Sequence, residues 1–190
     1  MEEYKKLIRQ LQDFPKKGIL FQDINPLLAN WKTLHAASSD LATQVSEVIP
    51  FVTKVLAVEA RGFILGGVLA SMLEAGMVPV RKKGKLPTYD SLRTVEYQLE
   101  YGTDSLSVDV SLLNYHDHIL IFDDVLATGG TAEATYKLLA NESKNAQFAP
   151  LSKHNLCFAF ILEIEALKGR KYLSKQTGIP DENIISLIKV

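Results

Sequence analysis

The sequence predicts an α/β protein whose mostly parallel central sheet is flanked by helices. Apolar, strand-like runs alternate with helical stretches along most of the chain, and this order favours parallel strands joined by helical crossovers. Several of these runs are continuously apolar, which is typical of strands buried on both faces. With 190 residues and 47% hydrophobic content, the chain suits one packed core. We therefore expect a single domain over residues 1–190.

The first part of the chain is expected to form a short helix followed by an irregular loop. Helical spacing of apolar and aromatic side chains predicts the helix, and the residues concerned are Tyr4, Leu7, Ile8, Leu11 and Phe14. The next stretch, FPKKGILFQDINPLL, is interrupted by two prolines and a glycine. It is predicted to be an ordered loop without helical or strand regularity.

Helices and strands then alternate to the end of the chain. A helix at 31–48 should end before Pro50, because the residue before a proline avoids the helical conformation. The further elements are a strand at 53–60, a helix opening at Gly62, strands at 77–81, 105–113 and 118–124, a helix at 131–140, a strand at 155–165, a short helix at 167–175 and an apolar tail at 184–190. Two polar segments lack a sustained period. Residues 81–102 are expected to form a long mobile loop or an extended hairpin, and residues 141–155 a surface insertion.

The composition of the chain indicates its cellular compartment and argues against some classes of binding partner. The 21 basic and 22 acidic residues nearly cancel, which argues against nucleic acid or an anionic membrane surface as a partner. The single cysteine, Cys157, lies in an apolar run and suits a reducing compartment. The sequence contains no apolar segment near the roughly 20 residues that a membrane span needs. We therefore expect a cytoplasmic protein.

A glycine-containing turn follows the apolar run HILIFDD, at a strand end where parallel sheets bind ligands. Its residues Ala127, Thr128, Gly129, Gly130 and Thr131 can direct backbone N–H groups and two hydroxyls at an anion, aided by the dipole of the next helix. No lysine follows the glycines, so this is not a Walker loop. The glycine spacing also differs from the GxGxxG pattern of a dinucleotide-binding fingerprint. The pattern predicts a phosphate site.

Two acids precede this turn. Asp123 and Asp124 would repel a phosphate but can accept hydrogen bonds from the two hydroxyls of a ribose. A purely structural strand-to-helix turn would explain Gly129 but not the acids, glycines and hydroxyls together. The combination predicts a pocket for a ribose phosphate.

The stretch IFDDVLATGGT resembles the phosphoribosyl-pyrophosphate signature of the type I phosphoribosyltransferase family. Further stretches resemble those members of the family that use adenine: FPKKGILFQDINPLL, VEARGFILGG, VRKKGKLP and then LEYG. With LKGRKYL, the resemblance runs from about residue 10 to about residue 175. It implies an enzyme of purine salvage that transfers the 5-phosphoribosyl group from phosphoribosyl pyrophosphate to adenine, giving AMP and pyrophosphate. It also implies a homodimer, a small hood formed by residues 1–30, and magnesium carried by the substrate without direct protein ligands.

The resemblance assigns roles to the residues of the donor site. Asp123 and Asp124 would hold the ribose, and residues 127–131 the 5-phosphate. Pyrophosphate would be gripped by the loop Glu59, Ala60, Arg61 and Gly62, with a non-proline cis bond between Glu59 and Ala60. The alternative for Arg61 is a surface salt bridge or a helix-entry charge, which the glycine after it at a strand end argues against. The cluster at 81–85, taken alone, would be interpreted as a solvated face. The resemblance instead assigns Arg81, Lys82 and Lys85 to pyrophosphate, partly across the dimer interface, and leaves Lys83 in solvent.

On the purine side, the resemblance assigns Leu20, Phe21 and Gln22 to adenine, with Phe21 stacking on the ring. A core phenylalanine is the alternative. Glu100 and Tyr101 are the implied catalytic residues, with Glu100 assisting proton transfer at the purine. A flexible catalytic loop over 85–98 would close to exclude water. That loop lacks the glycine expected after its proline and is about two residues longer than the family pattern.

Two other functions remain open from the sequence. A phosphoribosyltransferase for guanine, hypoxanthine or xanthine would share DDVLATGGT, although FPKKGILFQDI and LEYG argue against it. A regulator that senses phosphoribosyl pyrophosphate would keep the pocket and add a DNA- or RNA-binding surface, but the near-neutral charge and the lack of a recognition-helix domain argue against it.

Overall fold

The computed structural model of the chain describes residues 2–88, 90–99, 102–140 and 155–190. Within them lies a seven-stranded sheet of order β5-β6-β4-β3-β7-β8-β9. Its strands are β3 (Lys54–Val58), β4 (Gly76–Lys82), β5 (Leu92–Leu99), β6 (Gly102–Asp109), β7 (Ile119–Leu126), β8 (Leu156–Glu163) and β9 (Ile184–Lys189). The pairs from β4 to β9 are parallel, and β6 joins β4 in antiparallel direction. The predicted α/β fold with a mostly parallel sheet is confirmed.

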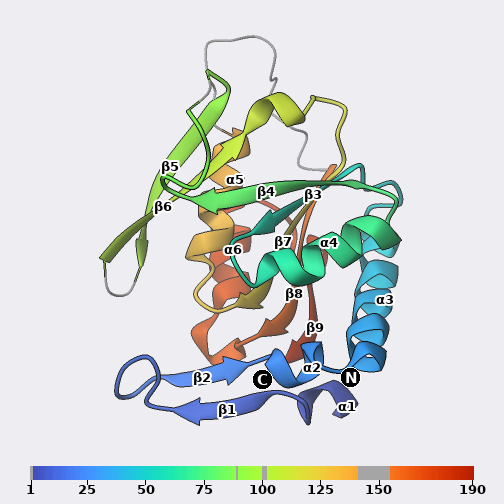
Figure 1. The fold of residues 1–190 in the computed structure, drawn as a ribbon, viewed down its shortest axis with the longest axis vertical. Coiled ribbons are helices and arrows are strands. Elements are labelled where there is room, and N and C mark those ends of the chain that lie inside the picture. The colour runs from blue at the N-terminus through green and yellow to red at the C-terminus, as the bar shows by residue number, and fades with distance from the viewer. Residues whose placement is uncertain (1, 89, 100–101, 141–154) are drawn as a thin grey trace.

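Two layers of helices cover this sheet (Figure 1). Helices α3 (Trp31–Val48) and α4 (Gly62–Met72) pack on one face, and α5 (Gly130–Ala140) and α6 (Gly169–Thr177) on the other. Helix α3 begins where predicted because the Asn30 side chain accepts a hydrogen bond from the backbone N–H of Lys32, as an N-cap residue does. Single 3-10 turns occur at 110–112, 165–167 and 181–183. Among the described helices, none is long and apolar enough to cross a bilayer.

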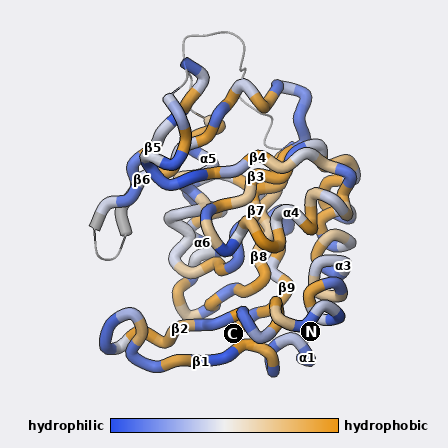
Figure 2. Tube along the Cα trace, viewed as in Figure 1, coloured by the Kyte–Doolittle hydropathy of each residue, from blue (hydrophilic) through white to orange (hydrophobic). Residues whose placement is uncertain are grey.

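The continuous apolar runs are explained by strands that are buried on both faces. In β7, Leu120 and Phe122 point into the core beneath α3 and α4, whereas Ile119 and Ile121 point into the core beneath α5 and α6. Figure 2 shows hydrophobic residues gathered along these central strands. The free energy of burial therefore fixes β7, and with it the positions of the acids near its carboxyl end.

The predicted N-terminal helix is wrong beyond its first turn. Helix α1 covers only Glu2–Lys5, and the chain then forms strand β1 (Arg9–Gln12), which pairs antiparallel with β2 (Leu20–Asp23). The expectation of a loop without regular structure is therefore also wrong, since β2 and the short helix α2 (Asn25–Leu28) lie within it. Pairing with a strand eight residues away is a non-local effect that local helical spacing does not reveal.

The expectation of a loop at 85–98 is wrong in its second half. Residues from Leu92 onward form β5, which pairs antiparallel with β6, so the alternative of an extended hairpin holds for this part. The apolar tail is strand β9, which pairs with β8. Most of the predicted insertion at 141–155 falls outside the described residues.

Candidate active site

The candidate site lies where the order of the strands reverses. Strands β3 and β7 are parallel neighbours, but the chain leaves β3 toward β4 and leaves β7 toward β8. The two loops after these strands therefore diverge and leave a crevice, the usual ligand position in an open parallel sheet. A cavity of about 550 Å³ opens here. A hollow of about 600 Å³ over α3 and α4 lies away from the strand ends and lacks such loops.

The main cavity brings together half of the predicted donor-site residues, and Gly62, Arg81 and Lys85 are not part of its lining. Its wall includes the loop after β3, the end of β4, both acids of β7 and the start of α5. The predicted residues that line it are Glu59, Ala60, Arg61, Lys82, Asp123, Asp124 and Thr131. A smaller cavity of about 50 Å³ lies beside it and is lined by the whole turn from Ala127 to Thr131. The ribose-side and phosphate-side residues thus face adjoining spaces.

The phosphate turn is shaped from behind by α6. Gly129 has φ +90°, a conformation that side chains disfavour, and a Cβ there would lie 2.9 Å from the carbonyl oxygen of Gly169. A Cβ at Gly169 would lie 2.1 Å from the carbonyl oxygen of Ala127. Tyr172 of α6 donates a 2.7 Å hydrogen bond to Glu133 in the first turn of α5. The turn is therefore held between two helices, and its residues line the cavity of about 50 Å³.

Asp123 and Asp124 lie inside β7, and the pKa of each is raised above its ordinary value. Burial raises the pKa of Asp123 well above its ordinary value, and the neighbouring charge of Asp124 raises it further. Burial also raises the pKa of Asp124, while the Arg61 guanidinium opposes this effect. Among the described residues, the buried Oδ2 of Asp124 has no well-aligned hydrogen bond. Its neighbour is the Arg61 guanidinium, whose Nε lies 2.7 Å away.

The loop after β3 places Arg61 between the acids and the N-terminal sheet. The Glu59–Ala60 peptide bond is cis, which confirms that expectation. Arg61 Nε lies 2.7 Å from Asp124 Oδ2, and its guanidinium lies 5.2 Å from the centre of the Phe21 ring. Gly62 begins α4, and a Cβ there would lie 3.3 Å from Asp123 Oδ1. The close approach of the two loops therefore depends on a residue without a side chain.

The cations at the end of β4 are paired with carboxylates. Arg81 Nε donates a 3.0 Å hydrogen bond to Glu59 Oε2, which also accepts from the Lys82 backbone N–H at 2.9 Å. Burial opposes ionisation of Glu59, but these two donors hold its pKa below the ordinary value. Lys82 Nζ lies 3.1 Å from Asp104 Oδ2. Lys85 is exposed.

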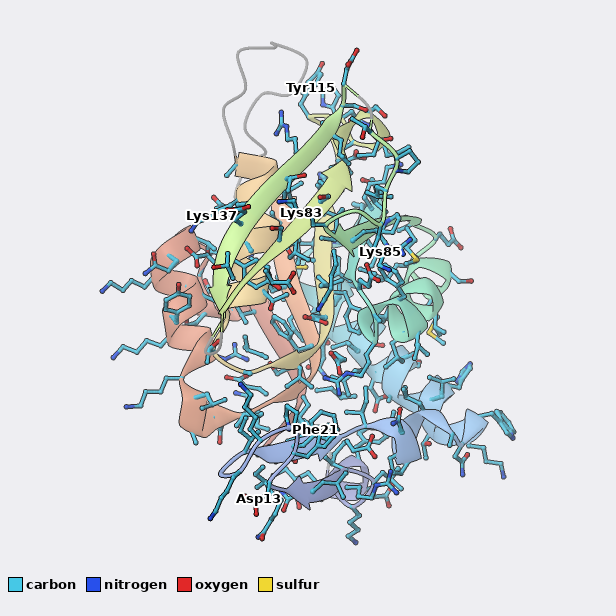
Figure 3. All side chains as sticks on the ribbon, turned by 60° about the vertical axis from the view of Figure 1, so that its left-hand side comes forward. Asp13, Phe21, Lys83, Lys85, Tyr115 and Lys137 are labelled. Atoms are coloured by element: carbon cyan, nitrogen blue, oxygen red, sulfur yellow. The ribbon has the colours of Figure 1, made fainter. Side chains whose placement is uncertain are left out.

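Lys83 lies apart from the cavity, as expected. Its ammonium group lies 3.5 Å from Glu96, and both side chains are mostly exposed, at 70% and 65%. Figure 3 shows Lys83 over the β5–β6 hairpin and Lys85 beside it.

The predicted purine residues lie on β2. Leu20 is exposed, Phe21 is half-buried and Gln22 is buried. The Phe21 ring contacts Phe14 edge-on with centroids 5.1 Å apart, so it belongs to the N-terminal sheet and is no part of the main core. Figure 3 places Phe21 on this two-stranded sheet, nearer than Asp13 to the body of the domain.

Two residues of the β5–β6 hairpin that were not predicted belong to the candidate site. Glu100 and Tyr101 lie outside the described residues. Tyr97 and Asp104 line the cavity and were not predicted. They are register partners across the hairpin, on the side whose next pair, Val95 and Leu106, packs on the core. An acid two residues before an inward-facing leucine was the signal available in the sequence.

An acid pair and a phosphate turn at the switch point of this sheet define a type I phosphoribosyltransferase. No family model matches the chain. An adenine phosphoribosyltransferase of Thermosipho melanesiensis is 45% identical over 186 residues, which cover 98% of this chain and 95% of that protein. The chain therefore belongs to the adenine phosphoribosyltransferase family.

Two solved structures agree with this assignment. The crystal structure of the Giardia lamblia enzyme, complexed with 9-deazaadenine, is 34% identical with a TM-score of 0.85 and covers 100% of this chain and 97% of that one. The adenine phosphoribosyltransferase of Thermoanaerobacter pseudethanolicus is 40% identical with a TM-score of 0.83, and the coverage is 100% and 99%.

Proposed function

We propose that this chain transfers the 5-phosphoribosyl group from phosphoribosyl pyrophosphate to adenine, giving AMP and pyrophosphate in purine salvage. The observation that carries the proposal is the cavity at the end of β3 and β7, whose wall holds two acids and the cations Arg61 and Lys82 beside a phosphate turn. This order of charges matches a donor with a ribose between two phosphate groups. Near-full-length relatives named adenine phosphoribosyltransferase support adenine as the acceptor.

The donor is proposed to lie along the cavity with its 5-phosphate at the start of α5 and its pyrophosphate at the loop after β3. Its 5-phosphate accepts hydrogen bonds from the N–H groups of the turn at 127–131, at the N-terminus of α5. Its ribose hydroxyls donate to Asp123 and Asp124. Its pyrophosphate meets the loop at 59–62 together with Arg81, Lys82 and Lys85. The buried acids favour a neutral hydroxyl partner, because their raised pKa values reflect the cost of burying two adjacent charges.

Adenine is proposed to lie against β2. Phe21 covers the purine face, while Leu20 and Gln22 flank it. The Arg61 guanidinium lies next to Phe21, at the boundary between the proposed purine and pyrophosphate sides of the pocket. The two substrates must bind on either side of this boundary.

The proposed reaction is a displacement at the anomeric carbon of the ribose. The bond from this carbon to the pyrophosphate oxygen breaks as its bond to purine N9 forms, and Glu100 takes the proton that the purine gives up. Arg61, Arg81, Lys82 and Lys85 stabilise the charge that develops on the leaving pyrophosphate.

Magnesium fits this site as a metal that the donor carries. Phosphate and ribose oxygens, with Asp123 and Asp124 nearby, are the hard oxygen ligands that Mg²⁺ prefers, and the ion would offset charge on pyrophosphate.

We also propose a cytoplasmic homodimer. Ile64 on α4 and Met77 on β4 are exposed apolar side chains on neighbouring elements, beside the strand that carries Arg81. Sedimentation equilibrium should give twice the chain mass, and Ile64→Asp should shift it toward the monomer.

Product analysis tests the proposed activity. Purified protein given adenine, phosphoribosyl pyrophosphate and Mg²⁺ should form AMP and pyrophosphate in equal amounts. The double variant Asp123→Asn/Asp124→Asn serves as the inactive control. Release of pyrophosphate without AMP would contradict the assignment of adenine as the acceptor.

A further inference from the structure

The β5–β6 hairpin contributes two polar side chains to the donor cavity, Tyr97 and Asp104. They face each other across the hairpin in the strand register. On the inward side of this hairpin, Val95 and Leu106 pack on the core, and Arg93 donates a 3.2 Å hydrogen bond to the carbonyl oxygen of Leu138. The carboxylate and the phenol are the polar members of this side that line the cavity, and they therefore call for a functional explanation.

Asp104 is tied to one of the cations assigned to pyrophosphate. Its Oδ2 lies 3.1 Å from Lys82 Nζ, and its side chain is 23% exposed, against 53% for Lys82. Side-chain hydrogen bonds also link the Tyr97 hydroxyl to Asp104 and to Thr131. The contacts thus run from Lys82, beside the loop at 59–62, to Thr131 at the phosphate turn.

An ion-pair partner can reduce the conformational entropy that a lysine side chain loses when it binds a ligand. Its ammonium group sits on a flexible four-carbon chain whose rotamer freedom must be lost when it binds a ligand. Asp104 uses one of the three N–H donors of Lys82 and leaves two for a phosphate oxygen. Holding the chain in place before the donor arrives reduces the entropy lost on binding.

We infer that Asp104 is a positioning residue for phosphoribosyl transfer, which holds the Lys82 ammonium group in the donor cavity while Tyr97 orients the Asp104 carboxylate. This inference rests on the proposed function, because it assumes that Lys82 meets the pyrophosphate group. It assigns Asp104 no contact with the reacting atoms. Electrostatics agree with it, since Asp104 raises the pKa of Lys82 and keeps the lysine charged.

A double-mutant cycle with magnesium pyrophosphate as the ligand tests the inference. Calorimetry should show that Asp104→Asn weakens pyrophosphate binding about three- to tenfold, the range expected when one side chain loses its pre-organisation. In a Lys82→Met background the same change should alter binding less than about twofold, because Asp104 acts through Lys82. In the transfer assay, Asp104→Asn should raise the KM for phosphoribosyl pyrophosphate and leave the KM for adenine nearly unchanged.

The neighbouring ion pair provides the matched control. Lys83, directly after β4, and Glu96, on β5 of the same hairpin, form an ion pair that faces solvent, so Glu96→Gln should leave pyrophosphate binding unchanged. Tyr97→Phe keeps the ring packed on the core and should weaken binding in the same direction as Asp104→Asn, by a smaller factor. Unchanged unfolding temperatures would confirm that each variant folds.

Two outcomes would overturn the inference. Tighter pyrophosphate binding by Asp104→Asn would mean that Asp104 competes with the ligand for Lys82. An equal loss with and without Lys82 would mean that Asp104 acts by another route. Failure of the proposed function is distinguishable, because wild-type protein would then bind pyrophosphate without forming AMP from adenine.

Discussion

At the residue scale, three of the four cations assigned to the candidate site are each paired with a carboxylate that lines the pocket. Arg61 pairs with Asp124, Arg81 with Glu59 and Lys82 with Asp104. Each pair fixes a flexible basic side chain near the expected position of a phosphate group. Isolated exposed ion pairs add little stability. These pairs therefore serve the geometry of the pocket more than the free energy of folding.

Asp123 is half-buried and its pKa is raised, so its charged form should cost stability. Asp123→Asn should therefore stabilise the fold at pH 7 while abolishing most activity. Because the pKa of Asp123 is raised, the native chain binds a proton more readily than the unfolded chain. The charged form is penalised above that raised pKa, and the penalty vanishes as pH falls toward the ordinary value of 3.8. Calorimetric melting should show an increase of about 2–4 °C at pH 7, as ~1 kcal/mol gives in a domain of this size, and a smaller one at pH 4.

Asp109 supplies the opposite control for this experiment. Hydrogen bonds from Ser111 and Ser91 lower its pKa, so it stabilises the fold above the unfolded pKa, and that contribution is lost as pH falls. Asp109→Asn should lower the melting temperature at pH 7 and do less at low pH. If both variants shift stability in the same direction, the argument from burial fails.

Substitutions on the donor side of the site should mainly affect donor binding, and substitutions on the purine side should mainly affect turnover. Asp124→Ala should raise the KM for phosphoribosyl pyrophosphate by about tenfold or more, because it removes a ribose acceptor and leaves Arg61 without its carboxylate. Glu100→Ala should mainly lower kcat, because proton transfer occurs in the transition state. Steady-state kinetics of both variants checks this, and equal effects on the two constants would contradict the division of roles.

Sequence reasoning found the residues whose roles follow from local motifs. Asp123, Asp124 and the turn at 127–131 are adjacent in sequence and meet at one strand end. Tyr97 and Asp104 were missed because their meeting in the cavity depends on the register of the hairpin. Register is set by pairing along the whole strand, which no short motif encodes.

At the scale of elements, the phosphate turn depends on the helix behind it. Gly169 at the start of α6 leaves no room for a side chain, since its Cβ would lie 2.1 Å from the Ala127 carbonyl oxygen. Gly169→Ala must therefore displace the turn or the helix.

We expect Gly169→Ala to lower the melting temperature and to raise the KM for phosphoribosyl pyrophosphate by roughly tenfold or more, because small displacements of a binding group are costly. Lys171→Ala, at an exposed position of the same helix, is the control and should leave both quantities unchanged. Normal donor binding by Gly169→Ala would show that the turn tolerates movement of α6.

The elements that sequence reasoning placed well are those buried on both faces. Strand β7 and helix α3 are specified by burial and by the cap at Asn30. Strand β1 is exposed throughout, so no apolar periodicity marks it as a strand. Its conformation comes from pairing with β2 and from the ion pair of Arg9 with Asp23.

At the scale of the whole molecule, topology creates the site. The reversal of strand order between β3 and β7 separates two loops, and the N-terminal sheet reaches their edge through Phe21 and Arg61. The sequence predicted the parallel sheet and the pocket at its carboxyl edge. It did not predict the N-terminal two-stranded sheet, because that sheet forms through contacts between segments that separately have weak preferences.

The most direct test of the account is the ratio of kcat/KM for adenine to kcat/KM for guanine and hypoxanthine, measured with saturating phosphoribosyl pyrophosphate and Mg²⁺. The account predicts efficient formation of AMP and a ratio of at least about 10³ in favour of adenine, because a site built to hydrogen-bond one purine edge leaves buried polar groups unpaired with another. Comparable or faster reaction with guanine or hypoxanthine would contradict it.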